Sequence, residues 1–136
     1  MLLNLLNWIP ALLWALIIFL QSHNPAPPGA DLAPDYIMHF LAYVILCLAL
    51  IYGFSGGVKS LWKGELELRH LYFAFLLAIV YGVTDEFHQS FIPGRNPSWA
   101  DVAADGLGGL AGAVLAGGWM KLRRGSEPDQ DHEVQF

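Results

Sequence analysis

The sequence has few charged residues and a single cysteine. Asp, Glu, Lys and Arg make up 14% of its 136 residues, whereas hydrophobic residues make up 55%. The mean hydropathy of +0.44 is too high for a small soluble domain and is typical of a helical membrane protein. Because Cys47 has no second cysteine to pair with, an intramolecular disulfide is excluded and a packing role is expected.

Long polar stretches are also scarce, because four apolar runs cover residues 2–20, 36–54, 71–92 and 99–120. Each run approaches the roughly 20 residues that a helix needs to cross a bilayer. We therefore predict an all-α integral membrane bundle of four transmembrane helices in one domain, residues 1–124. A disordered, acidic cytoplasmic tail, residues 125–136, is expected to follow it.

The first apolar run has an alternative interpretation as a cleaved signal peptide. No Lys or Arg precedes this run, and Pro25, Pro27 and Pro28 follow where small residues would mark a cleavage site. A retained helix is therefore expected, followed by an extended loop over residues 24–34. Trp14, within the run, is expected to face lipid or to pack against another helix.

Basic residues are almost missing from one side of the predicted membrane. Six of the seven lie between the second and third runs or after the fourth: Lys59, Lys63, Arg69, Lys121, Arg123 and Arg124. Arg95 lies on the opposite side. By the positive-inside rule, the chain is a multi-pass protein of the bacterial cytoplasmic membrane with both termini in the cytoplasm.

Polar residues gather at the outward ends of the predicted helices. The wholly apolar parts of the last three runs span about 21 to 23 Å, less than the ~30 Å hydrocarbon core. We therefore predict a polar pocket at the outer side, because ionisable groups within a membrane usually mark a functional site. Local bilayer thinning, with these groups at the headgroups, is the alternative. The pocket residues are Asp35, His39, Tyr43, Asp85, Glu86, His88, Gln89, Arg95, Ser98, Asp101 and Asp105.

Helical spacing places several of these side chains on common faces. Asp35 and His39 are four residues apart, and Asp85 is followed by His88 and Gln89 at three and four residues. The Asp35–His39 pair suits proton transfer or metal binding. A hydrogen-bonded structural histidine is the alternative.

The last polar motif contains two acidic residues close to the predicted start of the fourth helix. Asp101 and Asp105 are four residues apart and repel each other, so we expect a positive group between them. Ser98 is the predicted N-cap, which explains an acid at Asp101 but not at Asp105. Arg95, after a Pro-Gly turn, can neutralise these acids or hold a phosphate or carboxylate through its planar guanidinium.

Small residues recur every four positions in the last apolar run, at Ala104, Gly108, Gly112 and Ala116. Such a stripe allows helices to approach closely in membranes, and Gly82 offers a matching smooth surface on the third predicted helix. Packing within the chain is expected, with a homo-oligomer seam as the alternative.

The polar motifs resemble those of the VanZ-like family of bacterial membrane proteins. That family has an early Asp with His-Phe-x-x-Tyr, then Asp-Glu-x-x-Gln, Pro-Gly-Arg, and a late Asp with glycines. The matching residues are Asp35, His39, Phe40, Tyr43, Asp85, Glu86, Gln89, Pro93, Gly94, Arg95, Asp101, Asp105, Gly108 and Gly109. Tyr36 and Ile37 stand where relatives often have a basic residue, so an ion pair there is in doubt.

The resemblance implies a compact four-helix protein of the cytoplasmic membrane with a cell-envelope role. The family's founding member is linked to low-level resistance to the glycopeptide teicoplanin. No reaction is implied, because one fold can serve different functions.

Three functions are compatible with the predicted pocket. The first, which we favour, is binding of an anionic membrane lipid or lipid-linked cell-wall intermediate near Arg95, His39 and His88, with an effect on teicoplanin susceptibility. The excess of acids would then call for a bridging divalent cation. No nucleic-acid partner is expected.

The second function is a metal-assisted membrane enzyme acting on a lipid phosphate or pyrophosphate ester. Asp85, Glu86, Asp101 and Asp105 would hold the metal and a histidine would move the proton. The third is a proton-coupled transporter, which ranks last because the polar groups reach only one side of the membrane.

Overall fold

The chain folds into a bundle of long helices, in a computed structural model that describes residues 5–29 and 32–125. The elements are α2 (Ile9–Ser22), α3 (Asp35–Ser55), α4 (Val58–Trp62), α5 (Leu68–Gln89) and α6 (Trp99–Arg124). The described residues contain no strand. The prediction of an all-α bundle built from four apolar helices is therefore confirmed.

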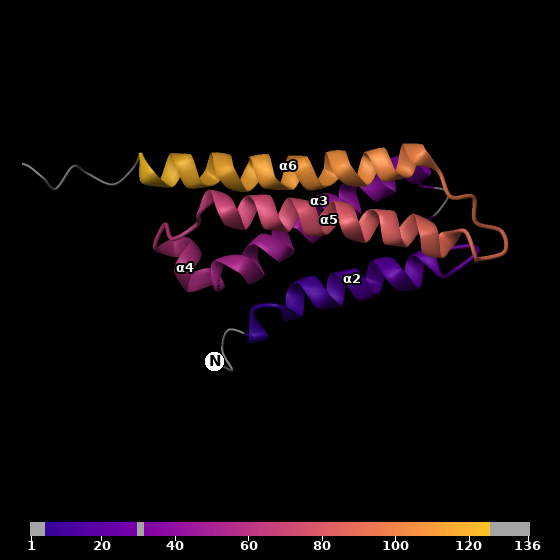
Figure 1. The fold of residues 1–136 in the computed structure, drawn as a ribbon, viewed down its shortest axis with the longest axis horizontal. Coiled ribbons are helices and arrows are strands. Elements are labelled where there is room, and N and C mark those ends of the chain that lie inside the picture. Colours follow the sequence, from indigo (N-terminus) through magenta and orange to yellow (C-terminus); the bar gives the residue numbers. More distant parts are fainter. Residues whose placement is uncertain (1–4, 30–31, 126–136) are drawn as a thin grey trace, which may run out of the picture.

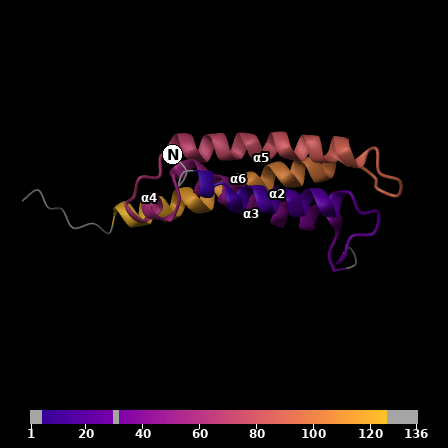
Figure 2. The same ribbon diagram turned by 90° about the horizontal axis from the view of Figure 1, so that it is seen from below.

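The four long helices run up and down along one common axis (Figure 1), and a second view shows the same direction (Figure 2). Helices α3, α5 and α6 are long and apolar enough to cross a membrane, whereas α2 is a shorter apolar helix. At 14 residues, α2 is about 21 Å long. The predicted tail lies, from residue 126 onward, outside the described residues.

Helix boundaries differ from the apolar runs that predicted them, for example at the ends of α5 and α6. Helix α5 ends at Gln89 rather than Ile92, because the next residues turn back through Gly94, whose φ is 89°. Helix α6 continues past Met120 to Arg124, because basic residues in a last turn are favoured by the helix dipole. The short helix α4 lies within the loop that joins α3 to α5 and was not predicted.

Close helix approach explains the small-residue stripe of α6. A Cβ atom on Gly108 would lie 2.3 Å from the carbonyl oxygen of Phe40, and one on Gly112 would lie 2.9 Å from the carbonyl oxygen of Val44, also in α3. The stripe therefore packs within the chain, against α3. Gly82 of α5 meets a different part of α6, where its Cβ would lie 2.7 Å from Oδ2 of Asp105. The expected match between Gly82 and the stripe is thus wrong.

Polar side chains separate to the two ends of the bundle. The starts of α3 and α6 and the ends of α2 and α5 lie together at one end (Figure 1), which brings the predicted pocket residues to that end. At the opposite end, the guanidinium of Arg123 lies 4.0 Å from the ring centre of Trp62, and Arg124 donates a hydrogen bond to the Leu66 carbonyl. Large apolar side chains such as Val80 and Val114 are exposed between the two ends. This pattern fits a lipid-facing surface.

Candidate functional site

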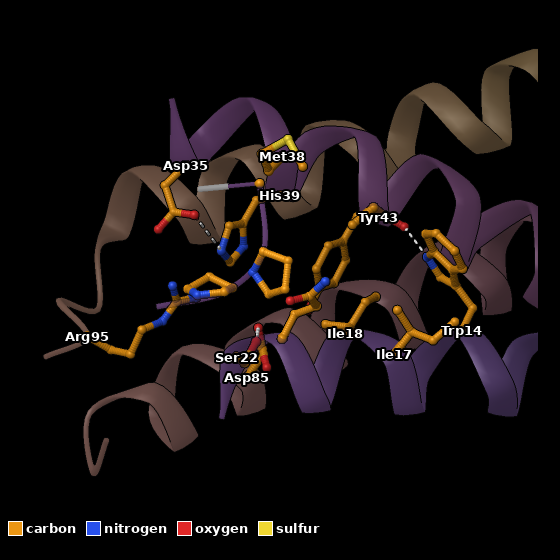
Figure 3. A pocket seen from close by; sticks show the side chains of 15 residues that line it. Trp14, Ile17, Ile18, Ser22, Asp35, Met38, His39, Tyr43, Asp85 and Arg95 are labelled. Atoms are coloured by element: carbon orange, nitrogen blue, oxygen red, sulfur yellow. Dashed lines mark hydrogen bonds and ion pairs between the residues drawn. The ribbon is translucent and has the colours of Figure 1, made fainter. Parts of the chain in front are cut away.

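A cavity of about 180 Å³ lies between α2 and α3 near the polar end of the bundle. One end of it is apolar and the other polar (Figure 3): the Trp14 ring lies at the first end, and Asp35 and Arg95 lie at the second. The apolar lining comes mainly from Trp14, Ile17, Ile18, Met38 and Ala42. The ionisable lining residues are Asp35, His39, Tyr43, Asp85 and Arg95.

Two hydrogen bonds to backbone carbonyls hold α2 beside the cavity. Trp14 Nε1 donates to the Ala42 carbonyl of α3 at 2.8 Å, and the Tyr81 hydroxyl of α5 donates to the Ala15 carbonyl at 2.6 Å. A Trp N–H or Tyr O–H away from water needs such a partner. Trp14 therefore does more than pack or face lipid, because it both lines the cavity and ties α2 to α3.

Asp85 is held by a network that joins α2 to α5. Its Oδ2 atom accepts hydrogen bonds from the Ser22 hydroxyl at 2.8 Å and from Gln89 Nε2 at 3.2 Å. The expected Asp85–Gln89 face is thus present, and Ser22 is a site residue that the sequence reasoning missed. The signal was there, since polar residues 21–24 end the first apolar run. His88 lies apart from this network, with Nε2 3.3 Å from Nδ1 of His23.

His39 is the centre of a second network, which joins α3 to α5 and α6. Its Nδ1 atom lies 2.9 Å from Oδ1 of Asp105 and 3.8 Å from Oε1 of Glu86. Its Nε2 atom lies 3.9 Å from Oδ1 of Asp35. Asp35, His39 and Asp101 have potential metal-ligand atoms within 4.8 Å of one another. The group that lies beside Asp101 and Asp105 is therefore the His39 imidazole, which is positive only when it is protonated.

Glu86 also fixes the start of α6. Its Oε2 atom accepts a hydrogen bond from the backbone N–H of Ser98 at 2.8 Å, while the Ser98 hydroxyl accepts one from the N–H of Ala100. The predicted N-cap at Ser98 is confirmed. Glu86 thus connects the polar end of α5 to the first turn of α6.

Arg95 reaches the cavity from the loop between α5 and α6. Its backbone N–H donates to the Ile92 carbonyl at 3.1 Å, which closes the turn around Gly94. The guanidinium interacts electrostatically with Asp85 and Asp101 but forms no ion pair within 4.0 Å with a described carboxylate. Its buried Nε atom has no hydrogen-bond partner among the described residues. The guanidinium therefore lies at the polar end of the cavity without a salt bridge to a described carboxylate.

The predicted site residues differ in where they lie relative to the cavity. Five line the cavity: Asp35, His39, Tyr43, Asp85 and Arg95. Four more are buried behind it: Glu86, Gln89, Asp101 and Asp105. The Tyr43 hydroxyl is buried, and no described residue supplies a partner for it. The remaining two are the N-cap Ser98 and the half-buried His88, whose ring lies beside Phe19.

A second, larger hollow of about 780 Å³ lies between α5 and α6. Its lining is apolar apart from Arg69 and the Tyr72 hydroxyl. A binding site normally combines apolar walls with a few converging polar groups, so the cavity beside α2 is the better candidate.

The family comparison covers nearly the whole described chain. Residues 4–120 match the family model described as VanZ/LLP1, and this span contains every residue of both polar networks. No curated protein and no solved structure matches the chain.

Proposed function

This chain belongs to the VanZ/LLP1 family, and from that premise we propose that it is a cell-envelope protein of the bacterial cytoplasmic membrane that binds an anionic amphiphile. The ligand class is an anionic lipid or a lipid-linked cell-wall intermediate. The observation that carries the proposal is the cavity beside α2, which is apolar at one end and is lined at the other by Arg95, whose guanidinium forms no ion pair with a described carboxylate.

The two ends of the cavity match the two parts of such a ligand. Ile17 and Ile18 offer a hydrocarbon surface, and Arg95 offers a planar set of N–H donors for a phosphate. The cavity, at about 180 Å³, is smaller than the roughly 300 to 1,000 Å³ of pockets that enclose a small molecule. The cavity therefore holds the headgroup and the first part of the chain, and the rest of the chain continues into the bilayer.

The acids beside Arg95 narrow the class of headgroup. Asp35 and Asp85 line the same polar end, and ionised carboxylates only accept hydrogen bonds. A bare phosphate would be repelled by them. A headgroup that carries hydroxyl or amino donors next to its phosphate satisfies both the acids and Arg95.

The distribution of basic residues orients the cavity. Lys59, Lys63 and Lys121 belong to the end of the bundle opposite the cavity, and positive residues favour the cytoplasmic side. Both termini are then cytoplasmic, and the cavity opens in the outer leaflet. An amphiphile bound there belongs to the external face of the membrane, where a glycopeptide acts, and teicoplanin susceptibility is the expected cellular readout.

Mass spectrometry of lipids retained by the gently purified protein tests the proposal. The wild type should retain an anionic amphiphile, and Arg95→Gln should retain about tenfold less, because a charge-assisted contact is lost. Arg69→Gln removes an exposed arginine at the opposite end and is the matched control. Equal retention by the wild type and Arg95→Gln would rule out headgroup binding by Arg95.

A second variant tests the apolar end separately. Ile18→Trp places a larger side chain on the apolar wall and should reduce retention without changing any charge. Loss in both Arg95→Gln and Ile18→Trp, with retention in Arg69→Gln, is the result expected for one amphiphile that spans the cavity.

A further inference from the structure

We propose that His39, Glu86 and Asp105 form a binding site for one divalent transition-metal ion behind the cavity. The site is built from three different helices, α3, α5 and α6. One imidazole with two carboxylates is a ligand set suited to zinc, manganese or ferrous iron. His39 also lines the cavity, but Glu86 and Asp105 lie outside its lining, so an ion can bind there whether or not an amphiphile is present.

The ligand atoms are close to the spacing that an ion requires. Nδ1 of His39 is 2.9 Å from Oδ1 of Asp105 and 3.8 Å from Oε1 of Glu86, and all three ligand atoms lie within 4.8 Å of one another. Metal–ligand bonds of about 2.0 to 2.2 Å hold two ligands of one ion no more than about 4.4 Å apart. Side-chain adjustments of well under 1 Å would therefore complete the site.

A carboxylate oxygen without a partner points to a missing ligand. The Glu86 side chain is only 7% exposed, and its Oε1 atom has no hydrogen-bond partner among the described residues. The other oxygen already accepts the N–H of Ser98, so Oε1 faces the imidazole of His39. At 3.8 Å this contact is too long to be a hydrogen bond. A buried, unsatisfied carboxylate oxygen is costly, and a bound cation would satisfy it.

The local charge balance also calls for a cation. Four carboxyl groups are buried at this end of the bundle: Asp85, Glu86, Asp101 and Asp105. Arg95 is the only Lys or Arg in the loop and helix starts around them. A metal-binding histidine is neutral, so with His39 as a ligand one guanidinium would face four carboxylates. A divalent ion offsets two of the remaining negative charges, which are costly inside a membrane.

A second set of potential metal ligands also contains His39 and can be compared with the proposed site. Asp35, His39 and Asp101 also bring ligand atoms within 4.8 Å of one another. The Asp35 side chain is 57% exposed, so water already satisfies its carboxylate. The group with Glu86 and Asp105 is therefore the stronger site.

The test uses full-length protein in detergent, stripped with a chelator, freed of added lipid and titrated with Zn²⁺ or Mn²⁺ by calorimetry. We expect one ion per chain, confirmed by elemental analysis. Glu86→Gln should weaken binding by more than about tenfold, because losing a direct ligand exceeds the effect of losing a supporting residue. Glu65→Gln, at an exposed acid near the opposite end, should bind like the wild type.

Asp105→Asn and Asp35→Asn complete the design. Asp105→Asn should weaken binding as Glu86→Gln does, and saturating metal should raise the melting temperature of the wild type but of neither variant. Asp35→Asn should keep wild-type affinity. The proposal is overturned if no stoichiometric ion binds, if Glu86→Gln and Asp105→Asn bind normally, or if Asp35→Asn alone loses the ion.

Discussion

Gly108→Ala offers a direct test of how α3 and α6 fit together. The added Cβ would lie 2.3 Å from the Phe40 carbonyl oxygen, more than 1 Å inside ordinary contact distance, which begins at 3.4 Å. This oxygen belongs to the backbone of α3 and cannot rotate away. The two helices would have to separate at the point where they pack most closely.

The expected cost follows from two opposing effects. Overpacking in a protein interior costs about 1 to 3 kcal/mol, and a fixed backbone obstacle favours the upper part of that range. Alanine in place of glycine gains up to about 1 kcal/mol of helix propensity. Gly108→Ala should therefore lower the free energy of unfolding by about 2 kcal/mol, which is roughly a thirtyfold change in the unfolding equilibrium.

Gly106→Ala is the matched control, on the same helix and one turn or less away. A Cβ at Gly106 meets nothing within 4 Å, so this variant should be as stable as the wild type or slightly more stable. Reversible unfolding of both variants in mixed micelles, driven by SDS, measures the difference. If Gly108→Ala were as stable as Gly106→Ala, the close approach of α6 to α3 would be refuted.

Three further substitutions probe single contacts by the same unfolding measurement. Ser22→Ala should lower stability by about 1 to 2 kcal/mol, because Asp85 loses a buried hydrogen bond; Ser90→Ala, at an exposed serine, should have little effect. Tyr43→Phe should leave stability unchanged or raise it, since the hydroxyl has no partner among the described residues. A lower free energy of unfolding would contradict that. Ser98→Ala should cost about 1 kcal/mol through loss of the N-cap, and an unchanged free energy of unfolding would count against the cap.

The helices could be predicted because the bilayer leaves the backbone few choices. An apolar segment in lipid must satisfy its own N–H and C=O groups, so a long apolar run becomes a helix of nearly the same length. The run at 36–54 corresponds to α3, Asp35–Ser55. The start of α2 and the five-residue helix α4 had no comparable signal. Short helices depend on their surroundings more than on their own composition.

The candidate site could be predicted only within single helices. The Asp35–His39 and Asp85–Gln89 pairs follow from helical periodicity, because residues four apart share a face. His88, three residues after Asp85, was assigned to the same face. In the structure its ring lies beside those of Phe19 and His23 at the end of α2, outside the hydrogen-bond network that holds Asp85.

The sequence by itself determined that the protein is a membrane-embedded helical bundle, and it identified the residues that make one end of that bundle polar. These properties depend on local composition and spacing. The tertiary structure decided which of the polar residues meet. The Ser22–Asp85 and His39–Asp105 contacts join residues 63 and 66 positions apart. Such contacts depend on which helix faces pack together. The glycines of α6 that allow close packing contact residues of α3 that are distant in the sequence, and spacing within one helix cannot identify those residues.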